Sequence, residues 1–370
     1  MDWLKSKLTS YGNSTTKSKI QKHREKFTLR EIRFGSHSIQ GEGPKKNECQ
    51  DTLTIITSGT NSNLPPTSKV SALTDNMNQG EGLYYSWGVL DGHGSSGKEA
   101  SNSAADHLQK FFEKNRNQIL KLETFKDRER FLNKAFSETE KQLKNSGIDY
   151  STSGTCCAFL FVKDNILTVA NLGDSRAVLC RIGKEKAAIE LTWDQKPTRK
   201  DEKERILSRG GKIERLNYNG DYVGPLRVWA DEEGPGIAMT RTLGDFQAKK
   251  IGLISEPEID HLWLKTRDQF IVVASDGIWD VMSSAEVVGF VLKHQDNWGS
   301  PDDVAISLCT EARKRWESNV EKKNFSNKIG DFPTARNGVD DITCIIAFFD
   351  FGNSDDGDLD ASMQKEMKVI

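Results

Sequence analysis

The chain has 370 residues, of which 36% are hydrophobic and 29% are charged, and its formal net charge is −2 at pH 7. This length is enough for one large domain or two ordinary ones, each with a buried core. The near-neutral charge argues against nucleic acid as a partner, and no apolar stretch approaches the ~18 residues that a membrane span needs, so we expect a soluble globular protein.

Charge is uneven at the two ends of the chain. Residues 1–34 hold nine Lys and Arg against three Asp and Glu, whereas residues 350–370 hold six acids against two lysines. Segments of this kind without apolar periodicity do not form a packed core. We therefore predict a basic, flexible N-terminal extension of residues 1–28, one folded domain of residues 29–352 and an acidic tail of residues 353–370. The basic arm is interpreted as a solvated tail, with contact to a partner or a membrane surface as the alternative.

The first half of the predicted domain begins with strands and continues with helices. TLTIIT (52–57) and LYYSWGVL (83–90) have the composition of strands, and a polar loop rich in Gly, Pro, Ser and Asn (58–82) separates them. Two helices should follow, because apolar residues recur there at helical spacing. The two apolar stripes, interpreted as core faces, are Ala104, Leu108, Phe111 and Phe112, and then Phe131, Leu132, Ala135, Phe136 and Leu143.

The middle of the chain is rich in strand-like segments. SGTCCAFLFV (153–162), NILTVANLGDS (165–175) and RAVLCRIG (176–183) are separated by short turn signals, which predicts an antiparallel meander. A charged helix (198–211) and a long loop (214–237) should follow.

The last third of the predicted domain places two helices between two strands. DQFIVVASDG (268–277) and DDITCIIAFFDF (340–351) have the composition of strands, and segments 283–295 and 301–316 have that of helices. A Ser followed by a Glu at the start of the first of these helices is typical of an N-terminal cap. Because strands occur in groups and helices in pairs, we predict the α+β class in preference to a doubly wound parallel sheet.

The six cysteines are Cys49, Cys156, Cys157, Cys180, Cys309 and Cys344. They form no CxxC pair, and four of them lie in apolar strand-like runs. This pattern favours buried, reduced thiols in a cytoplasmic and/or nuclear protein over disulfides.

Several aspartates stand at the ends of strongly apolar strands. Asp91 and Asp276 each close such a strand and precede glycine, whereas Asp51 and the pair Asp340 and Asp341 each open one. A carboxylate in this position is costly unless it is paired, hydrogen-bonded or bound to a metal. The flanking sequences contain no matching Arg or Lys, and oxygen ligands without His or Cys suit Mg²⁺ or Mn²⁺. A single Asp-Gly at a strand end is usually a turn, so the prediction depends on the whole set.

Eight motifs give the chain a family resemblance over roughly residues 34–350. In order, they are NECQD, VLDGHG, SGTCC, VANLGDSRAVL, LTWDQKP with ERILSRGG downstream, GIAMTRTLGD, VVASDGIWDVM and GVDDITCII. In this order they resemble the metal-dependent protein phosphatase 2C family of serine/threonine phosphatases. The resemblance implies a four-layer α-β-β-α sandwich of two antiparallel sheets flanked by helical pairs.

The resemblance also implies a centre of two Mg²⁺ or Mn²⁺ ions. Asp91 looks like the carboxylate that bridges both ions, and the Gly92 carbonyl adds a ligand. Asp276 and Asp340 look like ligands to one ion, and Asp51 supports the other, directly or through water.

Further acids match positions that lie near this centre in the family. Asp174 matches the acid that, with Asp276, holds a weaker third ion. Asp280 and Asp245 are acid positions near the site, and the motifs do not fix their roles.

The chemistry implied is attack of a metal-bridging water or hydroxide on phosphoserine or phosphothreonine without a covalent phosphoenzyme. Metal coordination brings the pKa of the water towards neutrality. His93 matches the general acid that protonates the leaving oxygen, and Lys46 the residue that grips the substrate phosphate.

The sequence departs from the family pattern at four places. Lys46 stands where Arg is usual, and an ammonium group cannot bind phosphate through two parallel hydrogen bonds as a guanidinium group does. Lys45 is a second candidate for phosphate binding. Gln50 stands where Glu is common, Gln195 where His is common, and Asp341 where Asn is usual. No principal ligand candidate is lost, so activity is expected.

One loop near the predicted site has two open interpretations. The segment GDYVGPLRVWADEEGPG (220–236) corresponds to the family's variable flap and is either a substrate-selecting surface or a solvated loop. Arg227, Trp229, Asp231 and the two glutamates that follow lie in it.

The resulting prediction is a monomeric signalling phosphatase that acts on phosphorylated proteins. One alternative is a catalytically weak pseudophosphatase that binds phosphoproteins or kinases. Another is a two-metal hydrolase of small phosphoesters or nucleotides, although no Gly-rich phosphate loop supports it.

Overall fold

The computed structural model describes residues 29–42, 48–58, 69–72, 84–183, 188–218, 220–230, 234–295, 300–326 and 338–351. The strands are β1 (Leu29–Ile39), β2 (Thr52–Thr57), β3 (Lys69–Ala72), β4 (Tyr84–Leu90), β5 (Gly92–His93), β6 (Gly154–Thr155), β7 (Cys157–Lys163), β8 (Ile166–Leu172), β9 (Arg176–Arg181), β10 (Ala188–Glu190), β11 (Lys212–Tyr218), β12 (Asp221–Trp229), β13 (Leu243–Gly244), β14 (Glu258–Trp263), β15 (Asp268–Ala274) and β16 (Ile342–Phe351). The helices are α3 (Gly97–Lys114), α4 (Arg116–Ile119), α5 (Phe125–Lys144), α6 (Lys200–Ser208), α7 (Phe246–Lys249), α8 (Asp276–Trp279), α9 (Ser284–His294) and α10 (Pro301–Ser326).

Two large sheets form the centre of the molecule. A five-stranded sheet has the order β1-β16-β15-β9-β10, and a six-stranded sheet has the order β14-β8-β7-β4-β2-β3. Their strands pair in antiparallel fashion except for β2 and β3, which are parallel. The predicted α+β class is therefore confirmed. The predicted meander is wrong at its third strand, because β9 leaves β7 and β8 and joins the other sheet beside β15.

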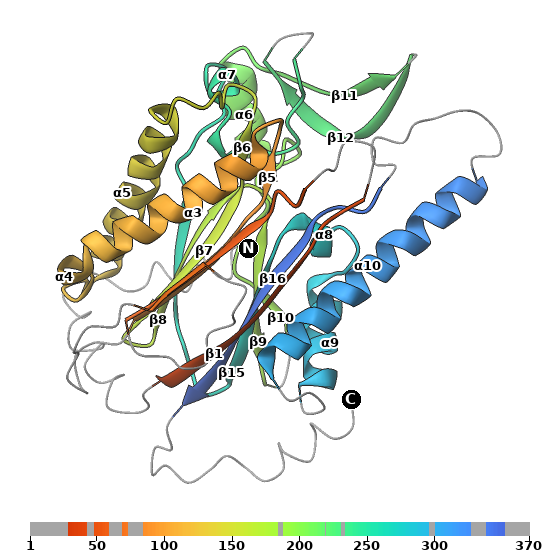
Figure 1. Cartoon of the computed structure of the whole chain (residues 1–370). Coiled ribbons are helices and arrows are strands. Elements are labelled where there is room, and N and C mark those ends of the chain that lie inside the picture. Colours follow the sequence, from red (N-terminus) through yellow and green to blue (C-terminus); the bar gives the residue numbers. More distant parts are fainter. Residues whose placement is uncertain are drawn as a thin grey trace.

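Helices cover the outer faces of both sheets. Figure 1 shows the α3–α5 pair against the six-stranded sheet and the α9–α10 pair against the five-stranded sheet. One apolar cluster joins α3 and α5 to their sheet, a second joins α9 and α10 to theirs, and a third fills the space between the sheets. The predicted stripes on α3 and α5 are buried in the first of these clusters.

The alternation of side chains along a strand explains how one strand contributes to two apolar cores. On β7, Cys157, Phe159 and Phe161 pack towards the helices, whereas the residues between them pack towards the other sheet. Successive side chains of a strand point to opposite faces. A strand with apolar residues at every position is therefore buried on both faces, as the uninterrupted run in the sequence indicates.

Several strands were not predicted, among them β10 and β14. The edge strand β1 lies at the start of the predicted domain, where no strand was expected; Ile32 and Phe34 are buried and alternate with charged residues that are not. The predicted loops contain β3 and the hairpin of β11 and β12. Strands of this kind are held by pairing with a neighbour more than by a local apolar run.

Two further observations concern cysteines and membranes. All six cysteines are described and carry free thiols, and five of them are buried. None of the helices that the structure describes combines the length and the apolar character needed to cross a membrane.

Candidate active site

The predicted carboxylates lie where the ends of four strands meet. Antiparallel pairing of β2 with β4 places the start of one beside the end of the other, and β15 and β16 are paired in the same way. Asp51 and Asp91 therefore flank one sheet end, and Asp276 and Asp340 flank the other. The Ser275 hydroxyl donates a 2.7 Å hydrogen bond to Asp51 Oδ2 and joins the two sheet ends.

The electrostatics of Asp91 show that five predicted ligands lie together. Burial raises the pKa of the Asp91 carboxyl well above its ordinary value, and the negative charges of Asp51, Asp276, Asp340 and Asp174 raise it further. Like charges that approach one another disfavour ionisation. The structure thus gathers these carboxylates, while their roles as ligands remain predictions.

The environment of Asp51 fits a cation. Burial, followed by the charge of Asp341, raises the pKa of Asp51 to about 7. Its Oδ2 accepts the bond from Ser275, but its Oδ1 is buried without a hydrogen-bond partner in the described part of the chain. A buried carboxylate oxygen without a partner is expensive, and a divalent ion bound by oxygen ligands would satisfy it.

The structure supplies the role of Asp341 that the motif leaves open. Its carboxylate accepts hydrogen bonds from the backbone N–H groups of Gly41, at 2.7 Å, and Gln50, at 3.0 Å. Asp341 is 4% exposed, so these two bonds compensate for its burial. It therefore anchors the segment that leads into Asp51 and also adds negative charge beside that residue.

The glycine after Asp91 is required by close packing. A Cβ atom at Gly92 would lie 2.2 Å from the Gly97 carbonyl oxygen and 2.7 Å from that of Gln50. No larger residue fits without a backbone shift. The Gln50 side chain, where the family often has Glu, donates a 2.9 Å hydrogen bond to the Gly94 carbonyl oxygen and so stabilises the turn around His93.

His93 is held by an acid whose role the sequence did not fix. Its Nε2 lies 2.7 Å from Asp245 Oδ2, and Asp245 is fully buried. Burial alone would lower the pKa of His93, but the charge and hydrogen bond of Asp245 outweigh it and raise that pKa. The other ring nitrogen, Nδ1, has no hydrogen-bond partner among the described residues.

The geometry around Asp245 is tightly constrained. Its backbone is left-handed, with φ of 52°, and its Oδ2 also accepts a 2.7 Å hydrogen bond from the Thr242 hydroxyl. A Cβ atom at Gly154 would lie 2.3 Å from that oxygen. The contact between His93 and Asp245 thus depends on a glycine on the neighbouring strand β6.

One cation lies beside the cluster. The sequence flanks of the strand-end acids contain no matching Arg or Lys, but Lys196 reaches neighbouring acids from another part of the chain. Its Nζ is 3.5 Å from Asp174 Oδ2, 3.5 Å from Asp194 Oδ2 and 4.0 Å from Asp280 Oδ1. Burial lowers the pKa of Lys196 less than these acids raise it. The residue belongs to the motif LTWDQKP, which is remote in sequence from the strand ends and so gave no hint of this contact.

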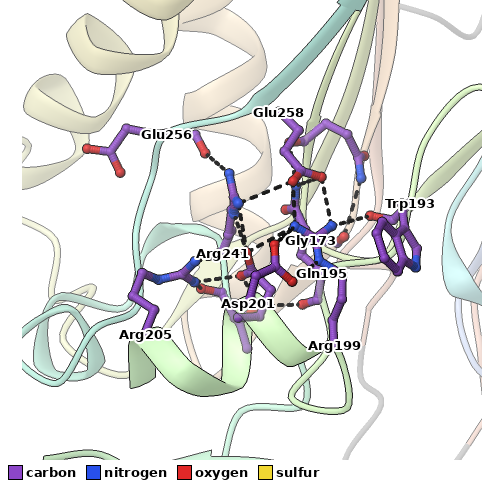
Figure 2. A network of polar contacts seen from close by, with 12 residues as sticks. Gly173, Trp193, Gln195, Arg199, Asp201, Arg205, Arg241, Glu256 and Glu258 are labelled. Carbon is purple, nitrogen blue, oxygen red and sulfur yellow. Dashed lines mark hydrogen bonds and ion pairs between the residues drawn. The ribbon is translucent and has the colours of Figure 1, made fainter. Parts of the chain in front are cut away.

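A second group of acids lies nearby but forms a different kind of site. Carboxylate oxygens of Asp201, Glu202 and Glu258 approach within 4.8 Å of one another. Figure 2 shows the guanidinium groups of Arg199, Arg205 and Arg241 around this group. Three cations already balance the three carboxylates, and burial of Glu202 is outweighed by these bonds, which lower its pKa to about 2. We therefore assign no metal here.

Some predicted site residues lie outside the described residues. Lys46 and Lys45 fall in the segment 43–47, and Asp231 and the two glutamates after it fall in 231–233. Within the described part of the flap, Arg227 donates to the Gly236 carbonyl oxygen at 2.7 Å. Trp229 donates to the Glu214 carbonyl oxygen at 3.1 Å.

Comparisons with known proteins identify the family and agree with the fold. The sequence model for "Protein phosphatase 2C" matches residues 60–320. "Probable protein phosphatase 2C 35" of Arabidopsis thaliana is 33% identical over 68% of this chain and 73% of its own length. "Probable protein phosphatase 2C 34" of the same plant is 32% identical over 72% of this chain and 73% of its own length.

Solved structures share the architecture. The serine-threonine phosphatase 2C of Toxoplasma gondii superposes with a TM-score of 0.62 at 17% identity, covering 88% of this chain and 97% of its own. At that identity the likeness concerns the fold alone. Together with the family match and the curated relatives, it shows that the chain belongs to the protein phosphatase 2C family of metal-dependent serine/threonine phosphatases.

Proposed function

We propose that the carboxylate cluster around Asp91 is a metal centre at which this phosphatase hydrolyses phosphoserine and phosphothreonine directly by water. The observation that carries the proposal is the convergence of four acids from distant parts of the chain on the partly buried Asp91. In their ionised forms, carboxylates gathered in this way are costly unless cations neutralise them.

The donor set fits hard divalent cations. The candidates are the carboxylates of Asp51, Asp91, Asp276 and Asp340, with the Gly92 carbonyl as a further oxygen. Only oxygen ligands are involved, which suits Mg²⁺ or Mn²⁺, and the unpartnered Oδ1 of Asp51 supports a ligand there. We infer two ions per site. When bound, such ions lower the pKa of water towards neutrality and neutralise charge on the phosphoryl group.

His93 is the group that would protonate the leaving serine or threonine oxygen. The alkoxide of these side chains is a poor leaving group at pH 7, so a positioned acid contributes typically ~10²–10⁴-fold. Asp245 holds Nε2 at 2.7 Å and raises the pKa of the ring, which favours the charged form. Nδ1, the other ring nitrogen, is buried and has no hydrogen-bond partner among the described residues, so it would donate a proton only to a substrate oxygen that reaches it there.

The thiols near the cluster are unsuited to covalent catalysis. Burial, followed by the charges of Asp174 and Asp91, raises the pKa of Cys156 well above its ordinary value. Burial and the charge of Asp51 raise the pKa of Cys49 to about 12. The thiolate is the nucleophilic form, so neither residue would form a phosphocysteine. This supports direct attack by water.

Other features of the proposal follow from composition. Five buried free thiols fit a reducing compartment, either the cytoplasm or the nucleus. We also keep the monomeric state as a prediction.

Replacement of single ligands tests the proposed centre. Asp91→Ala and Asp276→Ala should each abolish hydrolysis of a phosphothreonine peptide while circular dichroism shows a folded protein. Asp303→Ala, on the exposed side of α10, is the matched control and should retain activity. Full activity of either cluster variant would remove the metal assignment. An inactive wild-type protein that still binds the peptide would instead favour a pseudophosphatase.

A further inference from the structure

We propose that Glu140 on α5 and Lys249 on α7 are positioning residues for the proton donor, because their ion pair holds the loop that presents Asp245 to His93. The inference rests on the proposed function, since it takes His93 as the group that protonates the leaving oxygen. It adds two residues, outside the carboxylate cluster around Asp91, on which that step depends.

The loop that carries Asp245 has an unfavourable backbone. Gly244 and Asp245 both lie in the left-handed region, with φ of 84° and 52°. A residue with a Cβ atom adopts this conformation at a cost, and it persists where surrounding contacts impose it. Asp245 Oδ2 meets both the Thr242 hydroxyl, at 2.7 Å, and His93 Nε2, also at 2.7 Å. The contact with His93 therefore depends on what holds this loop.

Backbone pairing alone aligns the loop with His93 through very short strands. Gly154 of β6 pairs with Gly244 of β13 on one side and with His93 of β5 on the other. Each of these strands has two residues, so the pairing supplies few hydrogen bonds. The alignment needs further support from side chains.

One ion pair supplies this support by binding two backbone groups of the loop. Glu140 Oε2 accepts a 2.9 Å hydrogen bond from Gly244 N, and Lys249 Nζ donates a 2.6 Å hydrogen bond to the Thr242 carbonyl oxygen. Lys249 Nζ also lies 2.9 Å from Glu140 Oε1. The two side chains thus close a ring with the backbone immediately before Asp245.

Both side chains of the ion pair are largely shielded from water. The side chain of Glu140 is 15% exposed and that of Lys249 is 18% exposed, and Thr242 and Asp245 are fully buried. Hydrogen bonds are electrostatically stronger where water is excluded. Each side chain has two partners at 2.9 Å or less, so neither can withdraw without breaking two bonds.

Apolar contacts bring α5 and the loop together without fixing the direction of its peptide groups. Leu243 belongs to the same apolar cluster as Phe136 and Leu143 of α5, and Phe246 packs against it. The ion pair places α5 beside α7 (Figure 1). Apolar burial is non-directional, whereas the two hydrogen bonds hold the peptide groups on either side of Leu243. The ion pair therefore supplies the directional part of the contact.

Removal of either charge should loosen the contact between Asp245 and His93. A through-space effect on the acidity of His93 would have opposite signs for the loss of an acid and the loss of a cation, whereas a positional effect slows the reaction in both cases. We expect Glu140→Ala and Lys249→Met each to lose about tenfold or more in kcat on a phosphothreonine peptide. The loss on p-nitrophenyl phosphate, whose leaving group needs little protonation, should stay below about twofold.

The experiment is a double-mutant cycle with His93→Ala, measured as kcat on both substrates at saturating Mn²⁺. If Glu140 acts through His93, Glu140→Ala should cost nothing further on the peptide once His93 is removed. A residue that only stabilises the fold would lower both rates in both backgrounds. Glu138→Ala removes an exposed acid from the same helix and is the matched control, expected to leave both rates unchanged.

Circular dichroism checks that each variant is folded. Should Glu140→Ala fail to fold, Glu140→Leu combined with Lys249→Met takes its place in the cycle. This double variant leaves neither charge buried alone, and the same selective loss on the peptide is expected.

The outcomes separate the inference from the proposed function. A peptide-selective loss in His93→Ala that Glu140→Ala or Lys249→Met does not reproduce would overturn the positioning role alone. A loss in Glu140→Ala that persists in the His93→Ala background would do the same. Equal losses on both substrates in His93→Ala itself would overturn the general-acid role, and the positioning role with it.

Discussion

The raised pKa of Asp51 leads to a prediction about stability. Burial and the charge of Asp341 raise this pKa from 3.8 to about 7. The folded protein then binds a proton on Asp51 more tightly than the unfolded chain does. Without metal, the free energy of unfolding should fall as the pH rises from about 4 to about 7, by on the order of 4 kcal/mol in total.

The substitution Asp51→Asn removes this dependence. The amide retains an oxygen that can accept the Ser275 hydrogen bond, but it carries no charge at any pH. Any fixed cost of the substitution cancels when two pH values are compared. Between pH 5 and pH 8 the stability of the variant relative to wild type should rise by about 2 to 3 kcal/mol.

Urea unfolding in EDTA at both pH values measures this difference. The control variant Asp303→Asn, which changes an exposed acid on α10, should show no comparable change. A relative stability of Asp51→Asn that stays constant or falls between pH 5 and pH 8 would refute the reasoning. Saturating Mn²⁺ should stabilise wild type more than Asp51→Asn, since the variant lacks one of the proposed carboxylate ligands.

Two further predictions concern His93. The variant His93→Ala should lose about 10²-fold or more in kcat on a phosphothreonine peptide but much less on p-nitrophenyl phosphate, whose leaving group needs little protonation; equal losses on the two substrates would argue against the general-acid role. Gly154→Ala places a Cβ atom 2.3 Å from Asp245 Oδ2, so it should reproduce the selective loss on the peptide, and a peptide kcat equal to wild type would show that the contact with Asp245 is dispensable.

The sequence predicted the core elements because their signals are local. The apolar runs of β4, β7 and β15 and the stripes of α3 and α5 report burial directly. These local signals could not predict that β9 pairs with β15 in the other sheet. A turn between two apolar strands does not say which sheet the second one joins.

The candidate ligands were predictable because each stands at the end of an apolar strand in a recognisable motif. The residues that contact these ligands could not be predicted from the sequence. Lys196, Gln195 and Asp245 lie in recognised motifs, but their contacts with Asp174, Gly173 and His93 are tertiary and are not encoded in the neighbouring residues. The family pattern even marked Gln195 as a departure, whereas the structure gives it reciprocal hydrogen bonds with Gly173.

The most direct test of the metal centre is the metal dependence of catalysis. Hydrolysis of a phosphothreonine peptide by wild-type protein should fall to background in EDTA and return when Mn²⁺ or Mg²⁺ is added in excess. Turnover in EDTA at the rate seen with Mn²⁺ would contradict the assignment of the carboxylates around Asp91 to a metal centre.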